Sequence, residues 1–160
     1  MNPETTYYKS PIGTLEIKGD DKGVHSIYFI DDDFSTSLEV TSGELKKCIQ
    51  QLDEYFTGNR KEFELTLSPK GTEFQGKVWT ELLKVPFGKT RSYLEQSKKL
   101  GDVKAIRAVA SANGRNPISI IIPCHRIIGS DGSLTGYAGG VWRKKWLLEH
   151  ESGNKQQSLF

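Results

Sequence analysis

The segment around Cys124 combines the residue types that a nucleophilic site requires. Cys124 follows the apolar run Ile118–Ile122 and Pro123, and His125 and Arg126 come directly after it. The thiolate is the attacking form of a cysteine, and a neighbouring base or cation can lower the pKa of a thiol from about 8.5. The segment therefore predicts a reactive thiol at the end of a buried run. The alternative is an inert cysteine that fills core space, which is the more common role of a free thiol.

Two helices predicted upstream of this thiol form a paired motif. Ser92 and Glu95 make a capping box for the first helix, which should end at Gly101. Asp102 can cap a second helix that runs to about Asn113. Two helices joined by a three-residue turn are typical of a helix-turn-helix, and the small side chains of the second helix would let it approach a groove closely. A plain helical hairpin is the alternative.

Charge is distributed unevenly along the chain. The formal net charge is +2, but residues 1–83 carry 9 Lys and Arg against 15 Asp and Glu, whereas residues 84–145 carry 12 against 3. A basic block of this kind predicts a surface that attracts phosphates and binds them in a salt-sensitive manner. The alternative is a basic surface that only faces solvent.

The acidic N-terminal part predicts a small sheet with a helix. Residues 5–30 alternate apolar and polar side chains between turn signals, which is typical of a small antiparallel sheet. Thr41 and Glu44 form a capping box for a helix that ends near Gly58, and residues 63–67 predict a further strand.

A linker and a third capping box follow these elements. Residues 68–71 read as a linker, after which Thr72 and Gln75 begin a helix that should stop before Pro86. The order of elements indicates an α+β fold, with antiparallel sheet plus helix first and a mainly helical part second.

Composition excludes several classes of protein. The 160 residues suffice for one core or two small ones, and no apolar run approaches the roughly 20 residues needed to cross a bilayer. The N-terminus lacks the pattern of a secretory signal, so an intracellular protein is expected. Two cysteines and three histidines are too few for a disulfide framework or a convincing zinc site.

Several motifs surround Cys124 in a specific order. They are Asn116-Pro117, Ile122–Ile128 with its Pro-Cys-His-Arg core, Gly136–Gly140 and Trp146–Glu151. This pattern closely resembles the active-site region of the O6-alkylguanine-DNA alkyltransferases, also called methylated-DNA–protein-cysteine methyltransferases. The resemblance is continuous from about residue 74 to residue 151, whereas residues 1–70 resemble the family only in size and in the order of strands and helix.

The resemblance implies direct-reversal DNA repair. An alkyl group, usually methyl, would move irreversibly from O6-alkylguanine, and less well from O4-alkylthymine, to Cys124. The thioether formed has no good leaving group, so each molecule should act once, as a suicide methyltransferase. Residues 1–70 would form the N-terminal domain, ribonuclease H-like in the family, and residues 71–152 the DNA-binding alkyltransferase domain. Residues 153–160 are expected to be a flexible tail.

The family's catalytic roles carry over to matching positions. His125 matches the base that takes the thiol proton through a water. A water link is easier than direct contact, because neighbouring residues on a strand point apart. Glu151 matches the carboxylate that orients the imidazole. Tyr93 matches the phenol that donates a proton to the departing guanine. Asn116 matches the hinge asparagine that ties the recognition helix to the segment of Cys124.

The resemblance also implies how DNA is bound. Arg107 matches the arginine that enters the duplex and replaces an extruded base, because O6 is reachable only after the nucleotide flips out. The pocket for the flipped base is expected to include Tyr137, Ala138 and Ile127. Further DNA contacts are expected along the second helix, from Lys104, Ala105, Ala108, Ser111 and Arg115. Other cations of the basic block, Lys144 among them, are assigned to phosphates or solvent.

Some positions depart from the family pattern. Gln96 and Ser97 stand where the family commonly has an apolar residue and alanine, and the cysteine and histidine cluster that binds zinc in some members is lacking. We therefore expect no metal and no cofactor, and Cys48 is expected to belong to the core rather than to act as a second acceptor. The expected partner is double-stranded DNA with O6-alkylguanine, bound by a monomer without membrane contact. The location would be cytoplasmic, or nuclear in a eukaryote.

Two other functions are compatible with parts of the sequence. A helix-turn-helix regulator or lesion-binding protein without transfer activity explains the basic block, but it leaves Cys124, His125, Tyr93 and Glu151 without a role. A thiol hydrolase explains Cys124 with His125, but it leaves the basic helix unexplained. Cys124→Ser should abolish transfer and keep DNA binding, whereas Arg107→Ala should weaken repair of duplex DNA with less effect on a free alkylated base.

Overall fold

The computed structural model describes residues 3–36, 39–40 and 42–153, and the chain divides into two compact units. The first unit comprises Met1–Lys70 with Pro117–Ser119, and the second comprises Gly71–Asn116 with Ile120–Phe160. The predicted α+β class, with antiparallel sheet plus helix followed by a mainly helical part, is confirmed. Within the described ranges, no helix is both long and apolar enough to cross a membrane.

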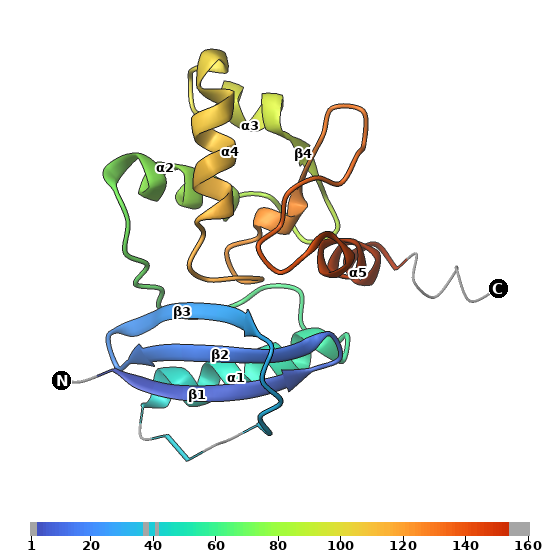
Figure 1. Cartoon of the computed structure of the whole chain (residues 1–160). Coiled ribbons are helices and arrows are strands. Elements are labelled where there is room, and N and C mark those ends of the chain that lie inside the picture. The colour runs from blue at the N-terminus through green and yellow to red at the C-terminus, as the bar shows by residue number, and fades with distance from the viewer. Residues whose placement is uncertain (1–2, 37–38, 41, 154–160) are drawn as a thin grey trace. The chain divides into compact units, whose positions relative to one another are not determined.

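The first unit is a three-stranded meander covered by one helix. Strands β1 (Glu4–Ser10), β2 (Gly13–Asp20) and β3 (Gly23–Ile30) pair antiparallel in the order β1-β2-β3, as the alternating pattern predicts. Helix α1 (Gly43–Phe56) lies along one face of this sheet (Figure 1). Side chains of one sheet face and of the apolar helix stripe bury each other: Leu15, Ile17, Val24, Ile27, Leu45, Cys48, Leu52 and Tyr55.

The N-cap of helix α1 lies one residue later than predicted. Ser42 is the N-cap, and its side chain accepts a hydrogen bond from the Leu45 backbone N–H. Thr41, the predicted cap, lies outside the described residues. Both residue types cap helices well, so the motif alone cannot separate adjacent candidates.

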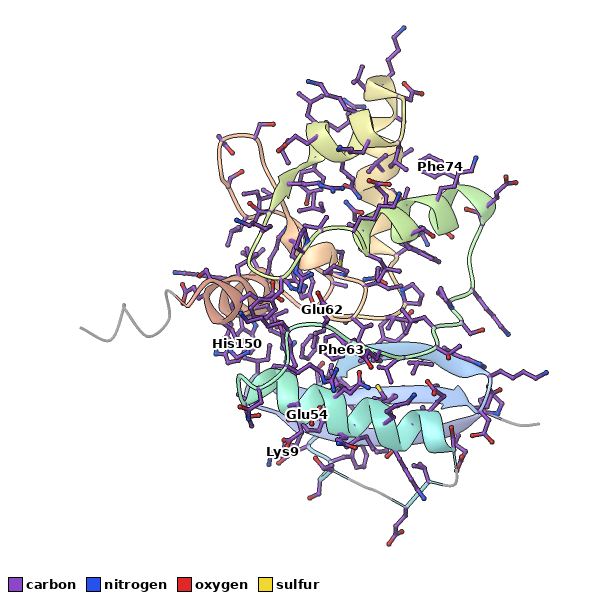
Figure 2. The ribbon with its side chains drawn as sticks, turned by 180° about the vertical axis from the view of Figure 1, so that it is seen from behind. Lys9, Glu54, Glu62, Phe63, Phe74 and His150 are labelled. Carbon is purple, nitrogen blue, oxygen red and sulfur yellow. The ribbon has the colours of Figure 1, made fainter. Side chains whose placement is uncertain are left out.

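The strand predicted over residues 63–67 is wrong, apart from a single parallel bridge between Leu67 and Val24. Side chains of helix α1, rather than a neighbouring strand, form hydrogen bonds with the backbone of this segment. Gln51 accepts from the Glu64 backbone N–H and donates to its carbonyl, at 2.8 and 3.2 Å. Phe63 packs beside Tyr55 of α1, with ring centroids 5.5 Å apart, and Figure 2 shows Phe63 next to this helix. An amide side chain on a helix can therefore replace a strand as the hydrogen-bonding partner of an extended segment.

A short segment from later in the chain completes the sheet of the first unit. Ile118 forms a parallel bridge with Ile27 of β3, and hydrogen bonds of 2.8 and 3.0 Å join Ile27 to Pro117 and Ser119. Residues 117–119 thus pack with residues 1–70, although they lie inside the range 71–152 that we expected for the second domain.

The second unit is built from short helices. Its elements are α2 (Glu73–Leu82), β4 (Arg91–Ser92), α3 (Tyr93–Lys99), the 3-10 helix η1 (Val103–Ala105), α4 (Ile106–Gly114), the 3-10 helix η2 (Cys124–Arg126), β5 (Ile127–Ile128) and α5 (Val141–Ser152). The capping boxes of Thr72 with Gln75 and of Ser92 with Glu95 are present as predicted. Helices α3 and α4 occupy the residues predicted for the helix-turn-helix, with η1 as an extra turn before α4.

Candidate active site

Cys124 is the first residue of the 3-10 helix η2, and it is partly exposed. The run before it is buried as predicted, but it turns rather than extends, because Ile120 adopts a φ of 72°. This left-handed conformation is rare for a β-branched residue and indicates local strain. The Cys124 backbone N–H donates to the Ile122 carbonyl at 2.8 Å, so the thiol is held in a tight turn rather than at the end of a strand.

His125 is fully buried beside the buried ion pair of Arg126 and Glu151. Its Nε2 lies 2.8 Å from Glu151 Oε2, and Arg126 binds both oxygens of the same carboxylate at 2.8 and 3.0 Å. Arg126 also donates to the Val85 carbonyl at 2.7 Å. Burial would raise the pKa of Glu151, but His125 and Arg126 outweigh it and hold that pKa far below its usual value. The carboxylate therefore stays ionised and holds the imidazole in place.

This arrangement selects one tautomer of His125. With Nε2 donating to the carboxylate, Nδ1 keeps its lone pair, and it has no hydrogen-bond partner among the described residues. Burial lowers the pKa of His125 below 6.5, although Glu151 opposes the shift. A neutral imidazole with a free nitrogen at neutral pH is suited to accept a proton.

Asn116 reaches the thiol directly. Its Nδ2 donates to the Ile122 carbonyl at 2.7 Å and to Cys124 Sγ at 3.3 Å. Burial raises the pKa of Cys124, and the hydrogen bond from Asn116 and the charge of Lys144 lower it in part. Both groups stabilise the thiolate, because Asn116 donates a hydrogen bond to the sulfur and Lys144 carries a positive charge.

Lys144 does not face phosphates or solvent as predicted. It is buried, and its Nζ donates to the Thr135 carbonyl at 3.0 Å. Tyr93 donates to the same carbonyl at 3.0 Å, and Lys144 Nζ lies 5.7 Å from the centre of the Tyr93 ring. Burial lowers the pKa of Lys144, and Cys124 opposes that shift. The spacing of Lys144, Leu147 and Glu151, which share the buried face of α5, is the signal that could have found it.

A cavity of about 550 Å³ lies beside Cys124. Tyr93, Arg107, Cys124, Tyr137 and Ala138 line it together, as do residues not predicted from sequence: Ile106, Ala110, Asn113, Gly114, Thr135 and Gly136. The buried Tyr137 hydroxyl has no partner within the described part of the chain, and burial raises its pKa well above the usual value. The volume of the cavity lies within the usual range for small-ligand sites.

Ile127 is not brought into this cavity. It is fully buried in β5, where its strand pairs with Arg91 of β4. Its place in the structure is that of a core residue beside the site, and the parallel pairing of β4 and β5 holds the start of α3 next to η2.

The residues predicted to contact DNA share the surface of η1 and α4. Lys104, Arg107, Ala108, Ser111 and Arg115 are exposed, and Ala105 is partly exposed. Arg107 is the member of this set that also lines the cavity. This surface therefore presents positive charge and small side chains directly beside Cys124.

Cys48 is buried in the first unit, and burial raises the pKa of its thiol to about 12. A thiol with such a pKa is almost entirely protonated at neutral pH and is a weak nucleophile. Within residues 3–36, 39–40 and 42–153, no group of three or more His, Cys, Asp and Glu residues is arranged to hold a metal ion.

The site has the features of thiol-dependent group transfer: a partly exposed thiol, an imidazole oriented by a carboxylate, and a cavity beside a basic helix. Two family models match the chain. The 6-O-methylguanine DNA methyltransferase ribonuclease-like domain matches residues 5–69, and the DNA binding domain of the same family matches residues 73–153. The chain therefore belongs to the 6-O-methylguanine DNA methyltransferase family, and the family predicted from the motifs around Cys124 is confirmed.

Relatives of known name and structure agree with this membership. The methylated-DNA–protein-cysteine methyltransferase of Methanosarcina barkeri is 45% identical over 150 residues, covering 91% of this chain and 95% of its own. The crystal structure of Mycobacterium tuberculosis O6-methylguanine methyltransferase is 40% identical with a TM-score of 0.84, covering 94% and 93% of the two chains. A complex of the M. tuberculosis protein with DNA matches at 42% identity and a TM-score of 0.83, covering 96% and 94%.

Proposed function

We propose that this protein repairs duplex DNA by moving an alkyl group from O6 of guanine to Cys124, once per molecule. The observation that carries the proposal is the position of Cys124 Sγ, which lines the cavity and accepts a hydrogen bond from Asn116. The buried relay of His125 and Glu151 supports it, because this relay leaves a free nitrogen to take the thiol proton. The family of the chain supports the reaction class.

The reaction begins with deprotonation of the thiol. His125 Nδ1 accepts the proton through a water, and Glu151 stabilises the imidazolium that forms. The thiolate then attacks the alkyl carbon, so the sulfur–carbon bond forms as the carbon–O6 bond breaks. Lys144 stabilises the thiolate until the attack through its positive charge, and Asn116 does so through its hydrogen bond to the sulfur.

The departing guanine takes a proton from Tyr93. In the free protein the Tyr93 hydroxyl donates to the Thr135 carbonyl, so it exchanges that acceptor for the base when the lesion enters. Lys144 remains on the same carbonyl and offsets the charge of the phenolate that proton transfer leaves. The thiol proton on His125 balances the proton that Tyr93 has lost, so the site returns to neutrality.

The exposed surface of η1 and α4 binds the duplex. Arg107 occupies the space of the extruded guanine, which is why it lines the cavity as well as the surface. Lys104 and Arg115 bind phosphates, whereas the small residues Ala108 and Ser111 let the helix approach the groove. Tyr137 and Ala138 pack on the flipped base.

Residues 71–152 are proposed to carry the chemistry and the DNA contacts, and residues 1–70 to form the ribonuclease-like domain. We propose that the protein acts as a monomer on duplex DNA, with no cofactor, in the compartment that holds the DNA. The reaction needs no group beyond a water and the side chains described, because the alkyl group passes to sulfur, the thiol proton passes to His125 and the guanine takes its proton from Tyr93.

Intact mass after incubation with a duplex that contains one O6-methylguanine tests the proposal. A gain of about 14 mass units, confined to the Cys124 peptide and saturating at one per chain, is expected. Cys124→Ser should lose the gain and keep DNA binding, whereas Cys48→Ala should keep the gain. A gain that survives in Cys124→Ser would reject this acceptor. Bound DNA without any gain in the wild-type protein would favour the lesion-binding function.

A further inference from the structure

Two buried amide side chains join the helices that flank the cavity. Gln96 on α3 and Asn113 on α4 are 1% and 6% exposed. Gln96 Nε2 donates to Asn113 Oδ1 at 2.7 Å, and Asn113 Nδ2 donates to Gln96 Oε1 at 2.8 Å, so the two bonds close a ring. Gln96 is one of the two positions at which the chain departs from the family pattern.

We propose that Gln96 is a positioning residue for alkyl transfer, acting through Asn113. The inference rests on the proposed function. A closed pair of amide hydrogen bonds is directional at both ends, and a buried amide that loses its partner pays the full cost of desolvation. An apolar contact at the same place tolerates a small slide of one helix along the other. The amide pair therefore fixes the register of α3 against α4 more tightly than packing alone.

Each of the two helices carries a part of the site. Helix α3 begins at Tyr93, the proposed proton donor, which lies one helical turn before Gln96. Helix α4 carries Arg107 and leads to Asn116, whose backbone N–H donates to the Asn113 carbonyl at 3.2 Å and whose side chain reaches Cys124 Sγ. Figure 1 shows α3 beside α4, and the two helices are in contact. A slide of α3 would thus change the position of Tyr93 relative to Cys124.

The amide pair and a strand pairing hold α3 at two different points. The parallel pairing of β4 and β5 fixes the start of the helix next to η2 and Cys124. The pair of Gln96 with Asn113 fixes the next turn against the far end of α4. Two ties at different points along a helix set its direction, whereas one tie leaves it free to pivot.

Asn113 also lines the cavity itself. An amide has two donor hydrogens and two acceptor lone pairs, and the ring uses one of each on Asn113. Gln96 therefore sets the orientation in which the remaining donor and acceptor of Asn113 meet a base in the cavity. Loss of Gln96 would affect the transfer rate through both Tyr93 and Asn113.

The test is single-turnover transfer from an O6-methylguanine duplex, measured over a range of DNA concentrations for Gln96→Leu. The rate constant at saturating DNA is expected to fall at least about tenfold, because misplacement of reacting groups by about 1 Å is costly. The DNA concentration for half-saturation should stay within about twofold, because Arg107 and the phosphate contacts are unchanged. The rate of iodoacetamide modification of Cys124 and its pH profile should also be unchanged.

Ser97→Ala is the matched control. Ser97 is equally buried and also departs from the family pattern, but its hydroxyl bonds within its own helix, to the Tyr93 carbonyl at 3.0 Å. Its transfer rate should stay within about twofold of wild type. If Gln96→Leu does not fold, Gln96→Met fills the same space with an unbranched side chain and replaces it in every measurement.

A double variant separates positioning from general packing. If Gln96 acts through Asn113, Gln96→Leu combined with Asn113→Ala should be no slower than Asn113→Ala alone. Additive losses would overturn the proposal, as would a Gln96→Leu rate within about twofold of wild type despite a lower melting temperature. Absence of transfer by the wild-type protein would instead reject the proposed function.

Discussion

Replacement of Glu151 by glutamine tests the charged cluster that holds His125. The Glu151 and Arg126 side chains are only 1% and 8% exposed, and removal of one partner from a buried ion pair costs about 3–5 kcal/mol. Glutamine keeps one acceptor oxygen, and Arg126 keeps the Val85 carbonyl, so we expect the low end, about 3 kcal/mol of unfolding free energy. The melting temperature should fall by roughly 6–12 °C.

The pH dependence of this loss follows from the sign of the shift. The pKa of Glu151 is depressed in the folded state, so its contribution is fully present above its usual value of 4.5 and declines as pH falls below it. Urea unfolding at pH 7 and at pH 3.5 should therefore show a smaller difference between wild type and Glu151→Gln at the lower pH. The transfer rate at pH 7 should fall by about 100-fold or more, because an amide can donate to His125 Nε2 and leave the wrong tautomer.

Glu149→Gln is the control on the same helix. Glu149 is partly exposed and its oxygen lies 4.0 Å from Lys145, so its loss should change the unfolding free energy by less than about 0.5 kcal/mol. The reasoning is refuted if Glu151→Gln unfolds within about 1 kcal/mol of wild type, or if both variants lose the same amount.

Three further results are expected. Lys144→Met should raise the pH at which Cys124 reacts with iodoacetamide, because a buried positive charge that stabilises the thiolate is lost. Lys145→Met, on the exposed side of the helix, should leave this pH unchanged, and equal profiles for the two variants would exclude a role for the Lys144 charge. Arg107→Ala should slow repair of duplex DNA by about tenfold or more while reaction with free O6-benzylguanine changes little, and an equal loss on both substrates would contradict a role in extrusion. Burial lowers the pKa of His125, so the imidazole should stay neutral between pH 8 and 6.5 and the transfer rate should fall through protonation of this base only at lower pH. A midpoint above 6.5 in the pH–rate profile would contradict a neutral, buried imidazole.

Local signals predicted the elements that their own residues determine. Two capping boxes placed the starts of α2 and α3, because a side chain that satisfies its own helix end acts within four residues. The alternation over residues 5–30 placed β1, β2 and β3 for the same reason. The strand predicted at residues 63–67 failed, because the backbone N–H groups of Glu64 and Thr66 donate to side chains of α1 more than ten residues away.

The candidate site shows the same division. Cys124 and His125 could be singled out from their types and adjacency, and Glu151 only through the family resemblance. The pairing of Gln96 with Asn113 depends on how separate helices pack, which no local pattern encodes. The burial of Lys144 depends on packing too, although its spacing with Leu147 and Glu151 on one face of α5 is a local signal. The turn at Ile120 was equally hidden, because a branched residue is normally evidence for extended structure.

The paired amides also constrain how the sequence of this protein can change over time. Replacement of either Gln96 or Asn113 alone leaves a buried polar group without its partner, whereas exchange of both for apolar residues of similar shape is nearly neutral for stability. An evolving lineage must therefore pass through a less stable intermediate, or change both positions together. Among descendants and close relatives, these two positions are expected to be inherited as a unit, as two amides or as two apolar side chains, with mixed pairs rare.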